Sequence, residues 1–392
     1  MTNEHITRLE VSNFKKFDRL VVENIGQVNL ITGDNNVGKT SLLEVLLLEP
    51  DMRIALTAFN YMVLSRSMNA KTDLKFEIGK EEENQRTNIV GVHQFNVKED
   101  TKIEMNLSNE ETRSLKLRNR IKSEFPEDAK SWALHRSNDD STDAKLELID
   151  NWLDLINNSN PKRKNISGQQ ELVASFYLDV KGESYKKYLN SDFDFPILKM
   201  EDFTISHHKR NKSILDRYSE IVRTGSTETK FITILNEIFP LRINAIRIGL
   251  NELEIRTQSQ DEYKPISYFG DGFIKALKIV LFILRGNSPK VMIDEIDTGI
   301  HFSRLKSFWV NVLTLAKETN TQLFCTTHSQ DCINAFVEAA AEVSEMKDKI
   351  RLIELEEALS EKSDRNVFAS TYNFDQINAG LNSDVNLRGG KY

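Results

Sequence analysis

The sequence predicts an α/β fold in which a phosphate-binding loop joins a buried strand to a helix. The loop is the run Gly33-Asp34-Asn35-Asn36-Val37-Gly38-Lys39-Thr40, which reads G-x-x-x-x-G-K-T and is followed by Ser41. An apolar run at 27–32 ends abruptly before it, as a buried strand does. Residues 41–48 favour a helix and meet no breaker before Pro50. The motif therefore stands between a strand and a helix, where its chemistry requires it.

The loop residues suit a nucleoside triphosphate. Gly33 and Gly38 let the backbone curl around phosphate oxygens without a Cβ in the way. Inward N–H groups and the helix N-terminus supply positive charge. Lys39 would reach the β- and γ-phosphates, and the Thr40 hydroxyl would ligate Mg²⁺. The alternative is a chance match on a glycine-containing turn, which the flanking strand and helix argue against.

The N-terminal part reads as strands around this loop. A half-buried strand at 8–12, a turn at 13–17 and a returning strand at 20–22 precede it. Downstream, residues 54–68 are expected to be helical. Alternating runs then predict an antiparallel sheet beside the nucleotide core. These runs are 74–78, 88–92 and 102–105.

The middle of the chain is polar and predicts an inserted, partly helical lobe. Its main element is an amphipathic helix expected at 146–156, with a strand at 172–180. The segment has no sustained heptad repeat, so we do not expect long coiled-coil arms. We divide the chain into an N-terminal half of the core at 1–107, the inserted lobe at 108–210, a C-terminal half at 211–345 and an extension at 346–392.

The C-terminal half returns to core-like patterns. One or two helices are expected between 214 and 239, split at 224–226, and a hairpin between 243 and 256. A strongly apolar helix follows 269–273 and stops at Gly286. Two buried strands, 290–293 and 322–327, enclose a helix with one apolar face. The last 45 or so residues read as short strands at 350–355 and 367–370, and a tail at 388–390 without regular structure.

An acidic pair and a histidine follow those two buried strands. Asp294 would hold Mg²⁺, and Glu295 would orient and deprotonate the attacking water. The alternative is a solvated acidic pair at a strand end, which the upstream loop disfavours. His328 is interpreted as a switch that reports on the γ-phosphate or the water. Its alternative is an incidental histidine in the helix-capping run Thr327-His328-Ser329.

A glycine-rich turn precedes the apolar helix. Gly270, Asp271 and Gly272 could present backbone N–H groups to the γ-phosphate held by a second molecule. An ordinary glycine N-cap turn is locally the stronger interpretation, and only the order of the motifs favours the functional one.

In that order, the motifs resemble the ABC-class ATPase heads of the AAA15/AAA21 group, which are related to OLD (overcoming lysogenization defect) and SMC/RecF ATPases. The resemblance covers about residues 1–60 and 210–345 and implies an ABC-type P-loop head: a mixed sheet with a flanking antiparallel sheet. It also implies a head-to-tail homodimer with ATP and Mg²⁺ at the seam. Lys39, Thr40, Asp294, Glu295 and His328 would act in cis and Gly270, Asp271 and Gly272 in trans. Asp297 would lie on the loop that crosses the seam.

The sequence departs from the family pattern in two places. The signature usually has a serine where this chain has Gly270, so the γ-phosphate contact would come from backbone or from Asp271. The glutamine that senses Mg²⁺ is not obvious; Gln94 is a candidate, and a plain strand residue is its alternative. OLD nucleases continue into a Toprim domain. Because this chain ends about 45 residues after the core, we expect no nuclease of its own.

Bulk properties limit the partners. Hydrophobic residues are 39% and charged residues 28% of the 392, typical of a globular protein. No apolar run approaches the roughly 18 residues of a membrane span, and the start lacks a signal-peptide pattern. Two cysteines, Cys325 and Cys332, favour a reduced, cytoplasmic setting. The net charge of −7 argues against a globally basic nucleic-acid surface, although a local groove could coexist with it.

Other charged residues give weaker signals. The basic clusters 162–164 and 207–210 are read as solvated loops, with a DNA-phosphate contact as the alternative. His93, His207, His208 and His301 lack zinc-site spacing. Lys15 or Lys16 is a candidate nucleotide contact, with a plain surface charge as its alternative.

Three functions remain open from the sequence. The first, which the family resemblance suggests, is an ATPase of a bacterial anti-phage system that controls a separately encoded effector, such as a nuclease, a reverse transcriptase or a toxin. The second is a nucleotide-gated scaffold with slow hydrolysis. The third is a DNA-binding repair or maintenance ATPase.

Overall fold

The computed structural model describes most of the two ends of the chain and part of its middle. The described residues are 5–48, 101–120, 149–157, 171–179, 184–186, 211–223, 225–250, 252–284, 290–359 and 365–383. Within them, no helix is long and apolar enough to cross a membrane.

The centre of the fold is a five-stranded sheet with the order β12-β13-β3-β14-β15. Its first four strands run parallel, and β15 pairs with β14 in the antiparallel sense. The strands are β3 (Val28–Gly33), β12 (Lys290–Ile293), β13 (Gln322–Thr326), β14 (Ile350–Leu359) and β15 (Arg365–Tyr372). Every residue of β3, β12 and β13 is buried, as expected of parallel strands covered on both faces.

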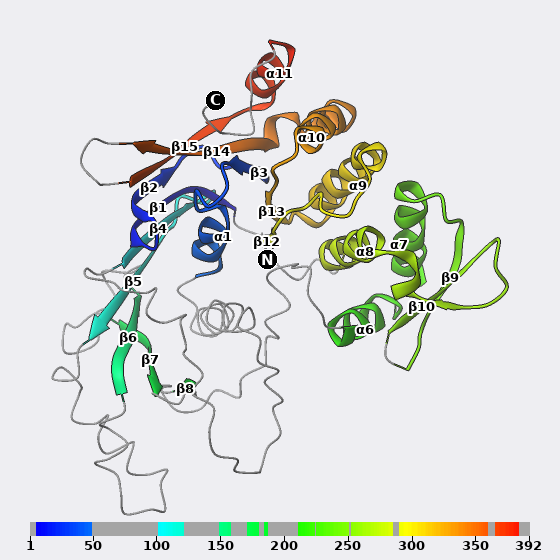
Figure 1. Ribbon diagram of the computed structural model, residues 1–392, viewed down its shortest axis with the longest axis horizontal. Helices are drawn as coiled ribbons and strands as arrows, with labels where there is room; N and C mark the ends of the chain where they lie inside the picture. Colours follow the sequence, from blue (N-terminus) through cyan, green and yellow to red (C-terminus); the bar gives the residue numbers. More distant parts are fainter. Residues whose placement is uncertain are drawn as a thin grey trace, which may run out of the picture.

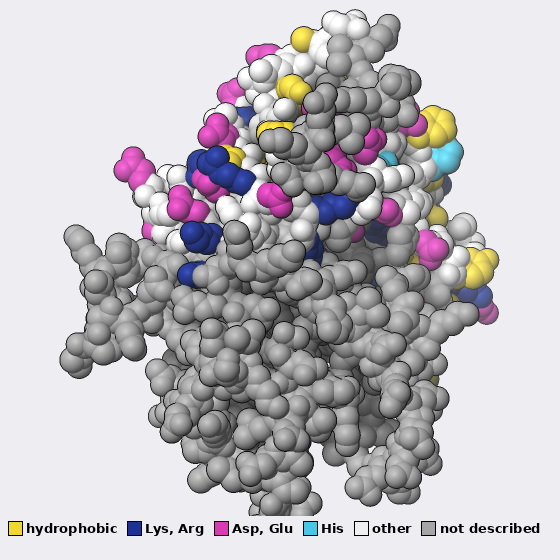
Figure 2. All heavy atoms as spheres, turned by 60° about the vertical axis from the view of Figure 1, so that its left-hand side comes forward, with side chains coloured by type: hydrophobic (Ala, Val, Ile, Leu, Met, Phe, Trp, Pro, Cys, Tyr) yellow, Lys and Arg dark blue, Asp and Glu magenta, His cyan; other side chains and the backbone are white. Residues whose placement is uncertain are grey.

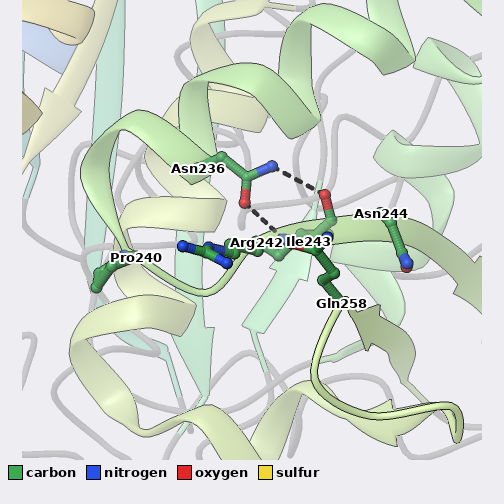
Figure 3. A pocket seen from close by; sticks show the side chains of 6 residues that line it. All are labelled: Asn236, Pro240, Arg242, Ile243, Asn244 and Gln258. Atoms are coloured by element: carbon green, nitrogen blue, oxygen red, sulfur yellow. Dashed lines mark hydrogen bonds between the residues drawn. The ribbon is translucent and has the colours of Figure 1, made fainter.

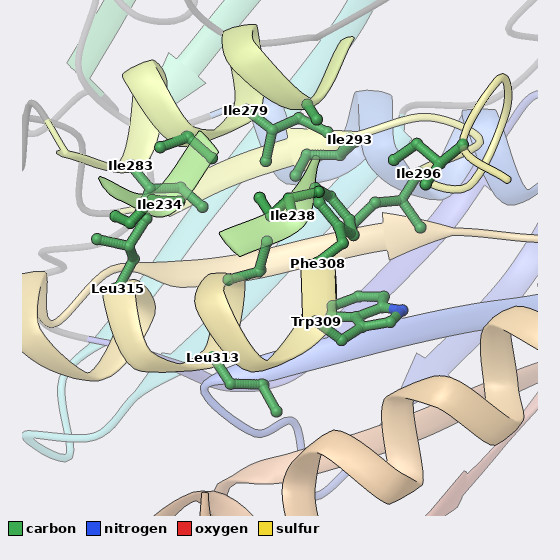
Figure 4. Close-up of a cluster of buried hydrophobic side chains, with 14 of the residues drawn as sticks. Ile234, Ile238, Ile279, Ile283, Ile293, Ile296, Phe308, Trp309, Leu313 and Leu315 are labelled. Atoms are coloured by element: carbon green, nitrogen blue, oxygen red, sulfur yellow. The ribbon is translucent and has the colours of Figure 1, made fainter. Parts of the chain in front are cut away.

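Alternate residues of the central strands feed two separate cores. Leu30 belongs to the core on the face of α8, α9 and α10, and Ile31 belongs to the core that contains α1. In the first core, Trp309 of α9 packs against Phe336 of α10 with ring centroids 4.7 Å apart, and side chains of α7 (Gly225–Ile238), α8, α9 and β12 meet in one cluster (Figure 4). Figure 1 shows α1 on the other face, beside β1 and β4. The helices are α1 (Lys39–Leu47), α8 (Asp271–Leu284), α9 (Phe302–Thr319) and α10 (Gln330–Glu342).

A second, antiparallel sheet lies beside this core and has the order β2-β1-β4-β5-β6-β7-β8. The predicted strands at 8–12, 20–22, 102–105 and 172–180 are confirmed in it. The expected helix at 54–68 and strands at 74–78 and 88–92 lie outside the described residues. The strands are β1 (Ile6–Phe14), β2 (Phe17–Val22), β4 (Thr101–Leu107), β5 (Thr112–Arg120), β6 (Ile149–Asn157), β7 (Glu171–Asp179) and β8 (Ser184–Lys186).

The helix predicted at 146–156 is wrong, because Ile149–Asn157 forms strand β6 between β5 and β7. Its apolar residues fit a helical period and a strand almost equally well, and the two neighbouring strands decide between them. The described parts of the expected helical lobe, β5 to β8, are all strands that extend the sheet. The domain boundaries at 107 and 210 stay predictions.

The C-terminal half contains the expected helices and hairpin. The helices are α6 (Asn211–Ile221) and α7 (Gly225–Ile238). The strands β9 (Ile243–Ile248) and β10 (Leu253–Thr257) form the hairpin, and β11 (Lys264–Pro265) adds a third strand. A short 3₁₀ helix, η3 (Ile266–Phe269), leads into α8.

The end of the described chain differs from its prediction in one element. The two expected strands are present as β14 and β15, and β14 lies directly beside β3 within the central sheet. The 3₁₀ helix η4 (Ser344–Lys349) precedes β14. Helix α11 (Phe374–Asn382) was not predicted, although Asn373 and Gln376 form a capping box at its start. The expected tail at 388–390 lies outside the described residues.

Candidate nucleotide-binding site

The phosphate-binding loop needs glycine at two positions for steric reasons. Gly33 has φ 140° and Gly38 has φ 116°, conformations that L side chains rarely adopt. A Cβ on Gly33 would lie 2.4 Å from the Leu355 carbonyl oxygen, and one on Gly38 would lie 2.8 Å from the Phe17 ring. Residues of strands β14 and β2 therefore pack directly against the loop, and the two glycines allow this close approach.

Helix α1 begins at Lys39, directly after the loop. Gly38 offers no side-chain cap to the first N–H groups of the helix. Uncapped N–H groups and the helix dipole make such an end a ready anion site.

Lys39 is held inside the loop by the loop's own carbonyl groups. Its Nζ donates hydrogen bonds to Gly33 O at 2.7 Å and to Asp34 O at 2.8 Å. Burial lowers the pKa of Lys39 to about 8, against the raising effect of Asp294 and other carboxylates nearby. When a triphosphate binds, its oxygens would take the place of these carbonyl groups as hydrogen-bond partners of the Lys39 amine.

The acidic pair lies next to the loop, at the end of β12. Thr40 Oγ1 donates to Asp294 Oδ2 at 3.3 Å, which brings together two segments 254 positions apart in the chain. Thr326, at the end of β13, donates from Oγ1 to Asp294 Oδ1 at 2.5 Å. The same hydroxyl accepts from the Glu295 N–H at 2.7 Å.

The oxygens at this point fit a magnesium ion. Mg²⁺ prefers oxygen ligands, keeps several waters and is usually held by one or two carboxylates plus substrate phosphates. The Thr40 hydroxyl and the Asp294 carboxylate, already within hydrogen-bond distance of each other, match that pattern. Among the described residues, no group of three or more His, Cys, Asp or Glu could form an all-protein metal site.

Glu295 has a left-handed backbone, with φ 49°. Such a conformation in a residue other than glycine costs about 1–3 kcal/mol and persists only where the surroundings impose it. Thr298 Oγ1 donates to Glu295 Oε2 at 3.1 Å, and Lys275 Nζ donates to the Glu295 carbonyl oxygen. Thr298 therefore holds the carboxylate, Lys275 holds the backbone carbonyl, and the residue itself is exposed.

His328 follows β13 and lies on the same side as Lys39. Its Nδ1 is 3.4 Å from Lys39 Nζ. Burial and then the Lys39 charge lower the pKa of His328, which favours the neutral imidazole at pH 7. The neighbouring Thr327 donates to Asp297 Oδ1 at 2.7 Å and accepts from the Ser329 N–H at 3.0 Å. Asp297, which was expected on the loop that crosses the seam, is thus hydrogen-bonded to the residue before His328 in the same chain.

In the glycine-rich turn, Gly270 and Asp271 are exposed and Gly272 is buried. Gly270, with φ 84°, and Asp271 are exposed, and a Cβ on Gly270 would meet no atom within 4 Å. Gly272 is buried against the loop after Glu295, where an added Cβ would lie 1.8 Å from Gly299 O. Gly272 therefore joins α8 to that loop, while Gly270 and Asp271 remain open to a ligand.

Sequence reasoning missed the hydrogen-bond partners that position the acidic pair: Thr326, Thr298 and Lys275. The one available signal was the lysine at 275 within a strongly apolar helix. Lys16 Nζ donates to Asn36 O within the loop at 2.5 Å, whereas Lys15 pairs with Glu44.

The other residues singled out in the sequence add no further ligand. His301 caps α9 by accepting from the Ser303 N–H. Gln94, His93, His207, His208 and the cluster 162–164 lie outside the described residues.

A pocket away from this site opens where α7 turns into β9 (Figure 3). Asn236 is fully used there, because its side chain accepts from the Ile243 N–H at 2.6 Å and donates to the Ile243 carbonyl at 2.8 Å. The amide therefore supports the turn. The lining residues are Asn236, Pro240, Arg242, Ile243, Asn244 and Gln258.

Comparisons with known proteins agree with a nucleotide site. The model of the family described as "AAA domain, putative AbiEii toxin, Type IV TA system" matches residues 28–331. A Helicobacter pylori protein named "ATP/GTP phosphatase" is 26% identical over 401 residues, which cover 98% of this chain and 100% of that protein.

Solved structures of SMC head domains also match over most of their length. The SMC head from Thermotoga maritima has a TM-score of 0.40 at 11% identity, covering 94% of this chain and 98% of that chain. The Pyrococcus furiosus Smc head bound to the C-terminal domain of ScpA has a TM-score of 0.41 at 13% identity, covering 97% and 99%.

Proposed function

The chain belongs to the AAA21 group of ABC-type ATPase heads, and we propose that ATP hydrolysis at its Lys39 loop controls a separate effector protein. The observation that carries the hydrolytic site is the contact between Thr40 of the loop and Asp294 of the acidic pair. That contact supports a single site made of a phosphate cradle, an oxygen pair suited to Mg²⁺ and a candidate base, Glu295, which follows Asp294 in the chain.

In the proposed reaction, water attacks the γ-phosphate in line with the leaving ADP oxygen. Lys39 and the N–H groups at the start of α1 hold the phosphate oxygens. Glu295 accepts a proton from the water, and the products are ADP and inorganic phosphate. Thr40 and Asp294 would hold Mg²⁺, whose role when bound is to offset negative charge on the phosphates. His328, neutral at pH 7, would sense the γ-phosphate from beside Lys39.

We further propose that two copies enclose ATP between their heads. Gly270 and Asp271 are exposed and can approach the nucleotide of a second copy. Tyr268 and Phe302, each 66% exposed, lie within a few residues of Gly272 and Gly299 in the sequence and offer apolar area to bury. The exposed turn and the exposed aromatic side chains support a protein interface at this surface.

The proposed cellular role is regulation of an effector in the bacterial cytoplasm. The family description names a toxin of a toxin–antitoxin system, which supports an effector that damages the cell or its invader. A nuclease, a reverse transcriptase or a toxin encoded nearby would fit an anti-phage system.

DNA binding has less support from the described surface. Figure 2 shows basic and acidic side chains interspersed over the described part of one face, without a field of one sign. Such a mixture gives little of the phosphate attraction on which DNA affinity depends.

The proposal is tested by phosphate release and by ATP binding in three proteins: wild type, Glu295→Gln and Lys39→Ala. We expect Glu295→Gln to bind ATP and to lose at least about 100-fold in turnover, the lower range for a general base. It should also accumulate an ATP-dependent dimer on size-exclusion chromatography. Lys39→Ala should lose ATP binding while remaining folded.

Equal, near-zero turnover in wild type and Glu295→Gln, with intact ATP-dependent assembly, would favour the scaffold function instead. Unchanged ATP affinity in Lys39→Ala would refute the site. Salt-dependent duplex binding that stimulates turnover would favour the DNA-maintenance function.

A further inference from the structure

Lys275 is the one charged residue among the buried residues of helix α8. Its side chain is 5% exposed, and the other buried residues of this helix are apolar or glycine. A lysine ammonium is almost never buried to this extent unless partners compensate for its lost hydration. The position therefore calls for an explanation beyond packing.

The partners of Lys275 are backbone carbonyl groups of the acidic pair. Its Nζ donates to Asp294 O at 3.4 Å and, more closely, to Glu295 O. The carboxylates of Asp297, Glu295 and Asp294 also attract the ammonium, although burial lowers the pKa of Lys275 overall. The lysine thus fixes the main chain at the acidic pair and leaves both carboxylate groups to other partners.

This contact completes the restraint on the Glu295 backbone. The Glu295 N–H is held by Thr326 of β13, and its C=O is held by Lys275 of α8. Together they fix both peptide groups around a residue with φ 49°. Without the lysine, the carbonyl would be free to turn toward a relaxed conformation and would carry the carboxylate with it.

A second contact couples α8 to the same loop. Gly272 and Gly299 approach so closely that a Cβ on Gly272 would lie 1.8 Å from Gly299 O. Helix α8 therefore touches the loop at two points, through Gly272 near its start and through Lys275 one turn later. Gly270, directly before the helix, and Asp271, its first residue, are exposed at the surface proposed to meet a second copy.

We propose that Lys275 is a positioning residue that holds Glu295 in the orientation for water attack and makes that orientation depend on the placement of α8. This inference rests on the proposed function, since it assigns a role within the same site. A displacement of α8 at the surface of the dimer would reach Glu295 through the lysine. Activity would then depend on assembly without any nucleotide contact by Lys275 itself.

The test compares Lys275→Met, which removes the donor at similar volume, with Lys278→Met one turn further along α8. For Lys275→Met we expect kcat to fall about 10- to 100-fold, the effect of a misplaced catalytic group, with ATP affinity within about threefold of wild type. Lys278→Met should leave both constants within about twofold.

A double-mutant cycle separates positioning from general loss of structure. In the Glu295→Gln background, adding Lys275→Met should change the residual turnover less than about twofold, because the group it positions is already gone. A further fall equal to that seen in wild type would overturn the proposal, as would an unchanged kcat in Lys275→Met. If Lys275→Met does not fold, Lys275→Gln, whose amide can still donate one hydrogen bond, should show a smaller fall in kcat.

The readouts keep the two proposals apart. If Glu295→Gln turns over ATP as fast as wild type, the proposed function fails and takes this inference with it. If Glu295→Gln is inactive and Lys275→Met is as fast as wild type, only the role of Lys275 fails.

Discussion

Replacement of Thr326 by valine tests how the acidic pair is held. The Thr326 hydroxyl is buried, donates to Asp294 Oδ1 at 2.5 Å and accepts from the Glu295 N–H at 2.7 Å. Valine fills nearly the same volume, so the change removes these two hydrogen bonds and little else. A hydrogen bond to a charged group contributes about 1.5–3 kcal/mol, and an N–H left without a partner costs about 1–3 kcal/mol. Allowing for partial access of water, we expect Thr326→Val to lower the free energy of unfolding by about 2–4 kcal/mol.

The assay is urea unfolding of Thr326→Val beside Thr314→Val and wild type. Thr314 Oγ1 donates only to Val310 O within its own helix, at 2.8 Å. Its replacement should therefore change stability by about 0.5 kcal/mol or less. Thr326→Val should also require more Mg²⁺ for half-maximal phosphate release, because Asp294 loses the bond that orients it. Equal stability of the two variants, with an unchanged Mg²⁺ requirement, would refute this description of the site.

Three further predictions concern the loop. Gly33→Ala should weaken ATP binding at least tenfold by titration, since the new Cβ would meet the Leu355 carbonyl at 2.4 Å. Gly225→Ala, where a Cβ meets nothing within 4 Å, should bind normally. Lys39→Ala should keep its thermal midpoint within a few degrees, because burial lowers the lysine pKa to about 8 and charged Lys39 opposes folding at neutral pH. That penalty shrinks as pH rises above about 8. Since bound triphosphate favours the charged amine, ATP affinity should fall as pH rises from about 8 toward 10, with proton uptake measurable by calorimetry. Lys39→Arg should show no such fall; a flat wild-type profile would contradict the pKa assignment.

The N-terminal and C-terminal halves of the core could be predicted because each buried strand is followed by a polar or glycine-containing turn. The run before Gly33 and the run before Asp294 end abruptly, and both are strands of the central sheet. Their meeting at Thr40 and Asp294 follows from parallel strands that end at the same edge.

The middle of the chain could not be predicted in the same way. In β6, apolar residues recur at spacings that suit either a helix or a strand. Pairing with β5 and β7 selects the strand. The insertion of β14 beside β3 depends on contacts far apart in sequence and leaves no local signal. The hydrogen bonds of Lys275 could not be predicted either, because its partners are backbone carbonyl groups of a loop distant in sequence.

A crystal structure of Glu295→Gln with ATP and Mg²⁺ would show whether the loop and the acidic pair form one nucleotide site. We expect a triphosphate on the N–H groups of the Gly33–Thr40 loop, with Lys39 on its β- and γ-phosphates. The ion should lie between the Thr40 hydroxyl and the Asp294 carboxylate. A nucleotide bound elsewhere, or one whose γ-phosphate is remote from residue 295, would contradict that expectation.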